Sequence, residues 1–294
     1  MLSVVLLAFM IMTYTAQSFF SRLYSNHYPG EDGASSSVFS IVSGFVVAFV
    51  ALCVSGFHFS AQPMTLVFGV TNALALICYN TTMMYASNKG PYSIQMVFML
   101  SGGILLPAFI NLARGTETLS IMQWVAIVMI IASIALVSKK EGDTKVNDPK
   151  FYLFCGGLFV SNGLYGALLN VQQEVTGVAE KEEMVILTFS ISALLSVVIG
   201  LITQRKKFLA GFRQTKKSAL FLLISSVATA CAVNLLVLLI ELMEDTTVLY
   251  TFDNSGVLLI SVIGSCLFFK EKLSRTNVIG CVLTCIGLIM ISVF

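Results

Sequence analysis

Residues 121–150 read IMQWVAIVMIIASIALVSKKEGDTKVNDPK, and the change of composition within this stretch indicates how the chain is organised. The first part, 121–138, carries no charged side chain. It is close to the length of about 20 mostly apolar residues that a helix needs to cross a bilayer. The second part, 139–150, is rich in charges and divides the chain into segments 1–138 and 151–294. We therefore predict two membrane-embedded halves joined by a charged linker.

The composition of the whole chain favours the same interpretation. Of 294 residues, 57% are hydrophobic and 11% are charged, whereas soluble domains carry about 25% charged residues. The first apolar run lacks a basic leader and a cleavage site, so we interpret it as a retained helix. The seven cysteines lie in apolar runs without disulfide or zinc spacing, and no nucleotide-binding loop is present. We expect no metal, no cofactor and no nucleic-acid partner.

Ten segments are long and apolar enough to cross a lipid bilayer. They run approximately over residues 2–20, 37–57, 64–86, 91–113, 121–138, 151–172, 184–203, 218–241, 248–269 and 276–293. Little of the chain remains for a soluble domain. The predicted fold class is therefore an all-α integral membrane protein with ten transmembrane helices.

The charges of the connecting loops predict an orientation. All of the 17 lysines and arginines except Arg114 and Lys181 lie after the first, third, fifth, seventh and ninth spans. Because cytoplasmic loops carry such an excess, we predict that 139–150 and 204–217 are cytoplasmic and that both termini lie outside a cell membrane. The outer loops hold the acidic residues Glu117, Glu174, Glu180, Glu182, Glu183, Glu241, Glu244 and Asp245. Solvated loop charge is the favoured interpretation of these acids, and a mouth that concentrates cations is the alternative.

The two halves also share polar landmarks. The pair Ser-Gly at 101–102 recurs at 255–256, and Asn80 recurs as Asn234. Each half has five predicted spans, and because five is odd, the second half enters the membrane upside down relative to the first. Such inverted repeats are typical of transporters, in which two similar halves exchange conformations and open a central site to either side.

The turn before the last span of each half carries a further pattern. It reads Glu117-Thr118-Leu119-Ser120 in the first half and Phe269-Lys270-Glu271-Lys272-Leu273-Ser274 in the second, which continues into Asn277-Val278-Ile279-Gly280 and Gly287-Leu288-Ile289. With its span count and halving, the chain resembles the drug/metabolite transporter superfamily in its ten-helix EamA-type form. The resemblance implies that four helices of each half surround a central cavity and that the fifth supports it from the periphery. Many relatives keep both termini in the cytoplasm, the reverse of what the loop charges predict here.

We interpret the two turns themselves as structural. Inverted halves would place Glu117 and Glu271 on opposite faces of the membrane, which argues against a shared catalytic role. Ser120 followed by Gln123 predicts a capping box at the start of the fifth span, and Ser274 predicts a cap on the tenth.

Asp253 is the leading candidate for a functional residue, because it is a carboxylate inside the predicted ninth span. A charged side chain at membrane depth costs about 2.5–3.5 kcal/mol on insertion scales, so it faces a cavity or a partner instead of lipid. No basic residue lies inside a predicted span to pair with it. We interpret Asp253 as a site for a cationic substrate group or a coupled proton. The alternative is a structural carboxylate bonded to neighbouring helices.

Several polar residues of other spans are weaker candidates. Asn80 and Asn234 either contact substrate or hydrogen-bond between helices. Tyr14 with Gln17, and Asn162 with Tyr165, are three residues apart, so each pair shares a helix face. The predicted substrate-binding residues are Asp253, Asn80, Asn234, Tyr79, Asn254, Tyr14, Gln17, Gln95, Asn162 and Tyr165. No catalytic or metal-binding residue is predicted.

Three functions compete. A secondary active transporter of a small metabolite or drug-like solute, with a preference for cationic or amine-bearing compounds, fits the inverted halves and Asp253 best. A non-transporting sensor or assembly subunit is the main alternative, which only a transport assay separates. An intramembrane enzyme fits least, because such enzymes need several charged or histidine side chains at one site, so the chain is not predicted to be an enzyme. The sequence leaves the substrate, the direction, the coupling ion and homodimer formation open.

Overall fold

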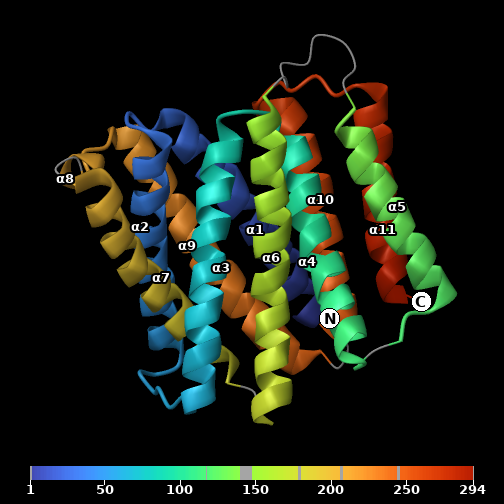
Figure 1. Ribbon diagram of the computed structural model, residues 1–294, viewed down its shortest axis with the longest axis horizontal. Helices are drawn as coiled ribbons and strands as arrows, with labels where there is room; N and C mark the ends of the chain where they lie inside the picture. The colour runs from blue at the N-terminus through green and yellow to red at the C-terminus, as the bar shows by residue number, and fades with distance from the viewer. Residues whose placement is uncertain are drawn as a thin grey trace.

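The computed structural model describes residues 2–116, 118–139, 148–177, 180–205, 208–243 and 246–293, and in this part of the chain every regular element is a helix. The helices run nearly side by side in one bundle (Figure 1). They are α1 (Leu2–His27), α2 (Asp32–Val54), α3 (Pro63–Ser87), α4 (Tyr92–Arg114), α5 (Ile121–Val137), α6 (Pro149–Thr176), α7 (Lys181–Gln204), α8 (Phe208–Gly211), α9 (Lys216–Leu242), α10 (Thr246–Phe268) and α11 (Arg275–Val293). The all-α fold class is confirmed.

Eight of these helices are long and apolar enough to cross a membrane. They are α1, α2, α3, α4, α6, α7, α9 and α10, while α5 and the apolar part of α11 are shorter. Each of the ten predicted spans coincides with one helix, and α8 is a single turn inside the predicted loop 204–217. Residues 140–147 of the predicted linker lie outside the described residues. The chain is therefore a multi-pass membrane protein.

Helix α1 continues beyond the predicted segment 2–20 because its polar last turns are buried. Ser25 Oγ donates a hydrogen bond to the Met84 carbonyl of α3 at 3.2 Å, and Tyr24 OH donates to the Ser35 carbonyl of α2 at 3.1 Å. The hydropathy of the sequence predicted the end of this span near residue 20, where the apolar run stops. The helix persists because these polar groups find partners on neighbouring helices.

The helices of the two halves interleave in one bundle. Helix α1 packs along α9, α2 along α7, α3 and α4 along α6, and α5 along α11. Glycine permits the closest approaches, because a Cβ atom on Gly102 would lie 2.1 Å from the Phe159 carbonyl oxygen, and one on Gly44 would lie 2.8 Å from that of Phe189. Close van der Waals packing of this kind holds membrane helices together, since lipid supplies no hydrophobic force between them.

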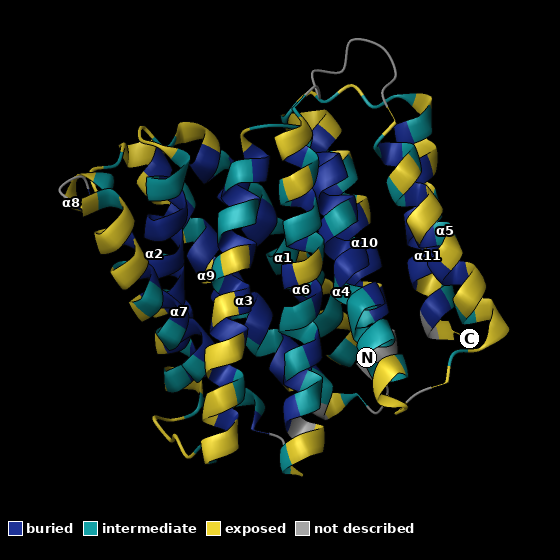
Figure 2. Cartoon of the chain, in the orientation of Figure 1, coloured by how far each residue is buried: buried dark blue, intermediate teal, exposed yellow. Residues whose placement is uncertain are grey.

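The distribution of side chains is the reverse of that in a soluble protein. Large apolar side chains are exposed, such as Leu153 at 71% and Leu267 at 69%. Exposed positions recur along the outer helices of the bundle (Figure 2). Serines such as Ser101, Ser192 and Ser225 are fully buried between helices. An apolar surface this extensive is compatible with lipid and would drive aggregation in water.

Helices α5 and α11 form a pair at one edge of the bundle (Figure 1). Ser133 and Thr284 share a hydrogen bond of 2.7 Å between them, and Gln123 Nε2 donates to the Ile291 carbonyl at 3.2 Å. The predicted capping box of Ser120 and Gln123 is confirmed, as is the cap of Ser274, whose Oγ accepts from the Asn277 N–H at 3.2 Å.

Candidate functional site

A cavity lies among the helices near the middle of the bundle. Its cavity volume is about 130 Å³. Its lining residues are Tyr14, Gln17, Phe39, Ser43, Leu76, Tyr79, Asn80, Met99, Leu100, Gly103, Asn162, Tyr165, Gly166, Leu169, Phe189, Thr229, Val233, Leu236, Tyr250, Asp253, Asn254 and Val257. They come from α1, α2, α3, α4, α6, α7, α9 and α10, and the edge pair α5 and α11 contributes none of them.

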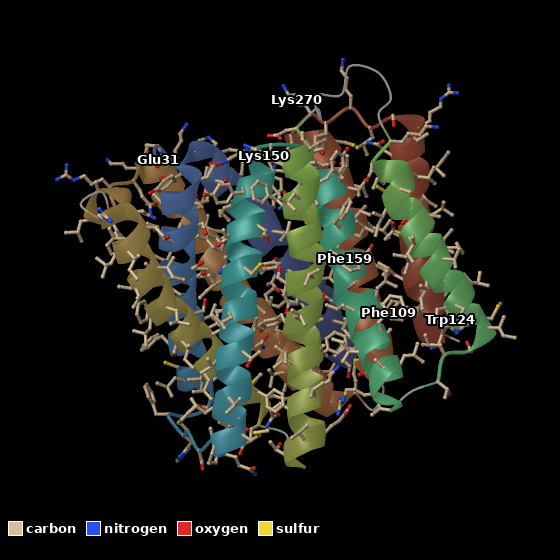
Figure 3. All side chains as sticks on the ribbon, in the orientation of Figure 1. Glu31, Phe109, Trp124, Lys150, Phe159 and Lys270 are labelled. Atoms are coloured by element: carbon tan, nitrogen blue, oxygen red, sulfur yellow. The ribbon has the colours of Figure 1, made fainter. Side chains whose placement is uncertain are left out.

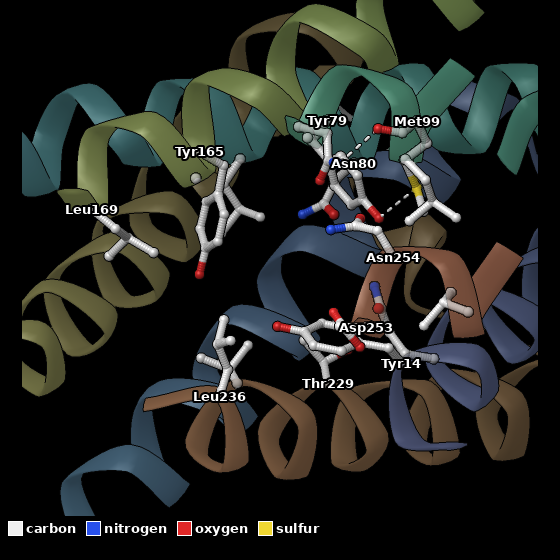
Figure 4. A pocket seen from close by; sticks show the side chains of 18 of the residues that line it. Tyr14, Tyr79, Asn80, Met99, Tyr165, Leu169, Thr229, Leu236, Asp253 and Asn254 are labelled. Carbon is white, nitrogen blue, oxygen red and sulfur yellow. Dashed lines mark hydrogen bonds between the residues drawn. The ribbon is translucent and has the colours of Figure 1, made fainter. Parts of the chain in front are cut away.

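Asp253 of α10 is the one acidic residue in this lining. Its side chain lies beside Tyr14 of α1 and Thr229 of α9 (Figure 4). The residue is 8% exposed, and its Oδ1 atom is buried without a hydrogen-bond partner in the described part of the chain. A buried acceptor without a donor is unfavourable, so a ligand with an N–H or O–H group would satisfy it.

A second polar group lies across the cavity from Asp253 and contains amides. Asn80 of α3 and Asn254 of α10 lie close to Tyr79 and Met99 (Figure 4). The Tyr79 hydroxyl points at the Met99 sulfur at 3.1 Å, and Asn254 Nδ2 donates to the Tyr250 carbonyl at 2.7 Å. The Asn254 carbonyl oxygen and the Asn80 amide remain able to bond a neutral polar group.

The remaining wall of the cavity is apolar and aromatic. Leu169 and Leu236 face the space beside Tyr165 (Figure 4), and Phe39 and Phe189 complete the lining from α2 and α7. An apolar pocket with a few convergent polar groups is typical of a small-molecule site.

Most of the predicted substrate-binding residues meet at this cavity. Asp253, Asn80, Tyr79, Asn254, Tyr14, Gln17, Asn162 and Tyr165 line it. Asn234 and Gln95 do not belong to the lining. The amide of Asn234 donates to the Ala230 carbonyl of its own helix at 2.8 Å, and Gln95 is buried against Ser87 and Met83.

Six lining residues of α2, α7 and α9 were not predicted from the sequence, namely Phe39, Ser43, Phe189, Thr229, Val233 and Leu236. Phe39 and Phe189 look like ordinary apolar residues of a span, so no sequence signal distinguishes them. Ser43 and Thr229 were polar residues within predicted spans, a signal that applies equally to the many serines buried between helices.

One end of the bundle carries Lys150 and Lys270 (Figure 3) together with Lys89, and we call it the basic end. There the Arg22 guanidinium contacts the Glu271 carboxylate at 3.2 Å, with both side chains 11% exposed. Glu271 also accepts from the N–H groups of Tyr92 at 2.5 Å and Ser93 at 3.2 Å, the first two residues of α4. A carboxylate at a helix N-terminus is favourable, because the helix dipole is positive there.

Aromatic rings close the basic end around this ion pair. The Arg22 guanidinium carbon lies 4.8 Å from the ring centre of Phe269 and 5.5 Å from that of Tyr92. The Tyr92 hydroxyl shares a 2.6 Å hydrogen bond with Ser18 of α1. Arg22, Glu271, Tyr92, Phe269 and Ser18 thus link α1, α4 and the turn between α10 and α11, and we call these five residues the basic-end latch.

The opposite end of the bundle differs, because a smaller pocket continues the cavity in that direction. This pocket shares Tyr165, Leu169, Val233, Leu236 and Tyr250 with the cavity and reaches Asn170 and Lys181 at the start of α7. Its cavity volume is about 10 Å³, far less than that of the main cavity.

The predicted acidic outer residues are only partly solvated. Glu180 is buried and accepts from the Gln62 N–H at 3.1 Å and from the Thr65 hydroxyl, which fixes the start of α3. Glu174 pairs with Arg114 at 2.6 Å. Glu117, Glu244, Asp245 and the side chain of Glu241 lie outside the described residues.

Within the described residues, no group of three or more His, Cys, Asp or Glu side chains is arranged to hold a metal ion. The seven cysteines are free thiols. The site is therefore organised around one carboxylate, several amides and tyrosine hydroxyls.

Comparisons with known proteins bear on the fold. No protein-family model and no curated protein match the sequence. A solved structure named only "Crystal structure of protein" superposes with a TM-score of 0.63 at 13% sequence identity, over 97% of this chain and 96% of that chain. At this identity the similarity concerns the fold alone.

Proposed function

We propose that this protein is a ten-span secondary active transporter of the drug/metabolite type, which moves a small solute across a cell membrane by alternating access. The observation that carries the proposal is the central cavity, which eight helices surround and which holds the buried, unpartnered carboxylate of Asp253. Intramembrane ionisable side chains that face a cavity mark substrate or ion sites. This carboxylate favours a cationic or amine-bearing solute.

The packing of the helices supports two inverted five-helix repeats, α1–α5 and α6, α7, α9, α10 and α11. In this assignment α1 corresponds to α6, α3 to α9 and α4 to α10. The contact between α1 and α9 then corresponds to the contact between α6 and α3, and the contact between α1 and α10 corresponds to that between α6 and α4. All four contacts are present. The matching glycines behave alike, because Gly102 of α4 meets Phe159 of α6 and Gly256 of α10 meets Ile11 of α1. Two such halves are able to exchange conformations around a fixed site.

The two ends of the cavity support a conformation that is closed toward the basic end. The basic-end latch lies between the cavity and that end, whereas the smaller pocket extends the cavity toward the opposite end. The excess of Lys and Arg at this end favours a cytoplasmic basic end and outer termini in this proposal. In this proposal, transport requires that the latch open.

Some hydrogen-bond donors of the basic-end latch have no acceptor in the closed form, which supports a role for the latch in the conformational change. Two nitrogen atoms of Arg22, Nε and Nη1, are buried without a hydrogen-bond partner in the described part of the chain. Each buried donor without an acceptor costs about 1–3 kcal/mol. Opening the latch would hydrate them and return part of this free energy.

A flux assay tests the proposal. The purified full-length protein is reconstituted into liposomes and screened with labelled metabolites and organic cations for saturable uptake that an unlabelled solute inside accelerates. Exchange of this kind is expected for at least one solute that fits the cavity. A folded, correctly inserted protein that exchanges no solute would contradict transport and favour the sensor or assembly-subunit alternative.

A further inference from the structure

The charges of the cavity lining restrict the chemistry of its ligand. The lining contains one carboxylate, Asp253, and no lysine, arginine or histidine among its described residues. A ligand with a single positive charge would complement this site. A zwitterion would bring a carboxylate into a low-dielectric space whose lining offers it no cationic partner, because Lys181 belongs to the smaller pocket at the opposite end from the latch, and such burial is unfavourable.

The surroundings of Asp253 suit an ammonium group. Tyr14 lies beside Asp253 (Figure 4), and Tyr250, three residues before Asp253 in α10, belongs to the same lining. Aromatic rings attract cations. The hydroxyl of Thr229 lies on the same side of the cavity (Figure 4). The Oδ1 atom of Asp253 still lacks a donor, which an ammonium N–H would supply.

The other lining residues indicate the chemistry of the part of the ligand that does not contact Asp253. Leu169, Leu236 and Tyr165 offer an apolar and aromatic wall, and the amides of Asn80 and Asn254 lie across from Asp253 (Figure 4). These groups match a compact apolar or aromatic body that ends in a neutral polar group, such as a hydroxyl or an amide.

We propose that the cavity is a site for compact aromatic or apolar monoamines that lack a carboxylate, with the ammonium group at Asp253 and a neutral polar group at Asn80 and Asn254. This inference rests on the proposed function and narrows its substrate class. It separates amines from the amino acids that differ from them by one carboxyl group.

A matched series of three probes tests the inference. Tyramine carries the ammonium and a phenol, tyrosine adds a carboxylate, and tyrosol replaces the ammonium by a hydroxyl. Binding of each to the purified full-length protein is measured by calorimetry and by the shift of the unfolding temperature, which a ligand of the folded state raises. Tyramine is expected to bind at least about 10-fold more tightly than either analogue, because hydrogen bonds to charged groups are the strong ones. The ratio of the affinities for the three probes is measured with the wild-type protein, so it does not depend on whether a variant folds.

Two variants test whether the preference for tyramine depends on Asp253. Asp253→Asn is expected to weaken tyramine on the order of 10- to 100-fold and to leave tyrosol within about threefold. Asp148→Asn is the matched control, because this carboxylate lies just before α6 and away from the cavity, where it accepts from the Lys150 N–H at 2.9 Å and pairs with the partly exposed Lys89 at 3.5 Å. Tyrosine binding as tight as tyramine, or tyramine binding that Asp253→Asn leaves unchanged, would overturn the inference.

Uptake of the same probes into liposomes separates the two proposals. Tyramine binding that depends on Asp253 without any exchange would leave the amine site standing and contradict transport. Exchange of tyrosol or tyrosine together with weak tyramine binding would support transport and refute the amine site.

Discussion

The basic-end latch yields the most detailed prediction, through the substitution Glu271→Gln. Glutamine keeps the size of the side chain and an oxygen that accepts from the start of α4, where the Tyr92 and Ser93 N–H groups now donate. It removes the negative charge that Arg22 contacts at 3.2 Å. The closed conformation then holds a buried guanidinium without an anion, whereas an open latch exposes both side chains to water.

The free-energy cost of this substitution to the closed form follows from the burial of the Arg22–Glu271 ion pair. Removing one partner of a buried ion pair costs about 3–5 kcal/mol. Here both side chains keep 11% exposure and Arg22 remains over two aromatic rings, so we expect about 2–3 kcal/mol. That free energy shifts the balance between closed and open forms on the order of 30- to 150-fold toward the open form.

Labelling of a buried position within the latch measures this shift. Ser18 is 3% exposed and bonds the Tyr92 hydroxyl, so Ser18→Cys, introduced with and without Glu271→Gln, places a thiol that the closed latch buries. A membrane-impermeant maleimide is added from the basic side, and peptide mass spectrometry reads position 18 apart from the seven native cysteines. Glu271→Gln is expected to raise the labelling rate at least about 10-fold.

The control breaks an ion pair at the other end of the bundle. Glu174→Gln removes the partner of Arg114 at 2.6 Å, where the side chains are 40% and 31% exposed. This exposed pair is worth at most about 1 kcal/mol, and labelling at position 18 should not change. Equal labelling in Glu271→Gln and wild type, or a loss of thermal stability without faster labelling, would refute a gating role for the latch.

Three further predictions concern packing, the site and the orientation. Gly102→Ala should lower the stability by about 1–3 kcal/mol, because its Cβ would meet the α6 backbone at 2.1 Å, whereas Gly156→Ala, with no atom within 4 Å, should have little effect in thermal unfolding. Asn80→Ala should weaken ligand binding in calorimetry by about 0.5–1.5 kcal/mol while Asn234→Ala leaves it unchanged, since only Asn80 lines the cavity. Reporter fusions at both termini should report an outside location, and cytoplasmic activity at the C-terminus would contradict the orientation predicted from loop charge.

The candidate site was predictable to the extent that polar groups are rare in membrane spans. Asp253 and the pairs Tyr14 with Gln17 and Asn162 with Tyr165 stand out from their apolar surroundings, and all five line the cavity. The rule fails for Asn234, which does not line the cavity although it is a polar residue of a span. Its amide donates to the Ala230 carbonyl one turn away, but Asn254 makes the same kind of bond to Tyr250 and does line the cavity, so the face of the helix decides and the residue type does not.

The sequence by itself determined that the chain is an all-α, multi-pass membrane protein, because apolar runs of span length admit no other stable solution in lipid. It also determined the caps at Ser120 and Ser274, since these bonds form within one turn. Only the tertiary structure decided that Arg22 meets Glu271, 249 positions later in the numbering, and that Phe39 and Phe189 face the same cavity as Asp253. Contacts between distant helices depend on how each helix is rotated about its axis and on where small residues let backbones approach. Neither is encoded in the local pattern of one span.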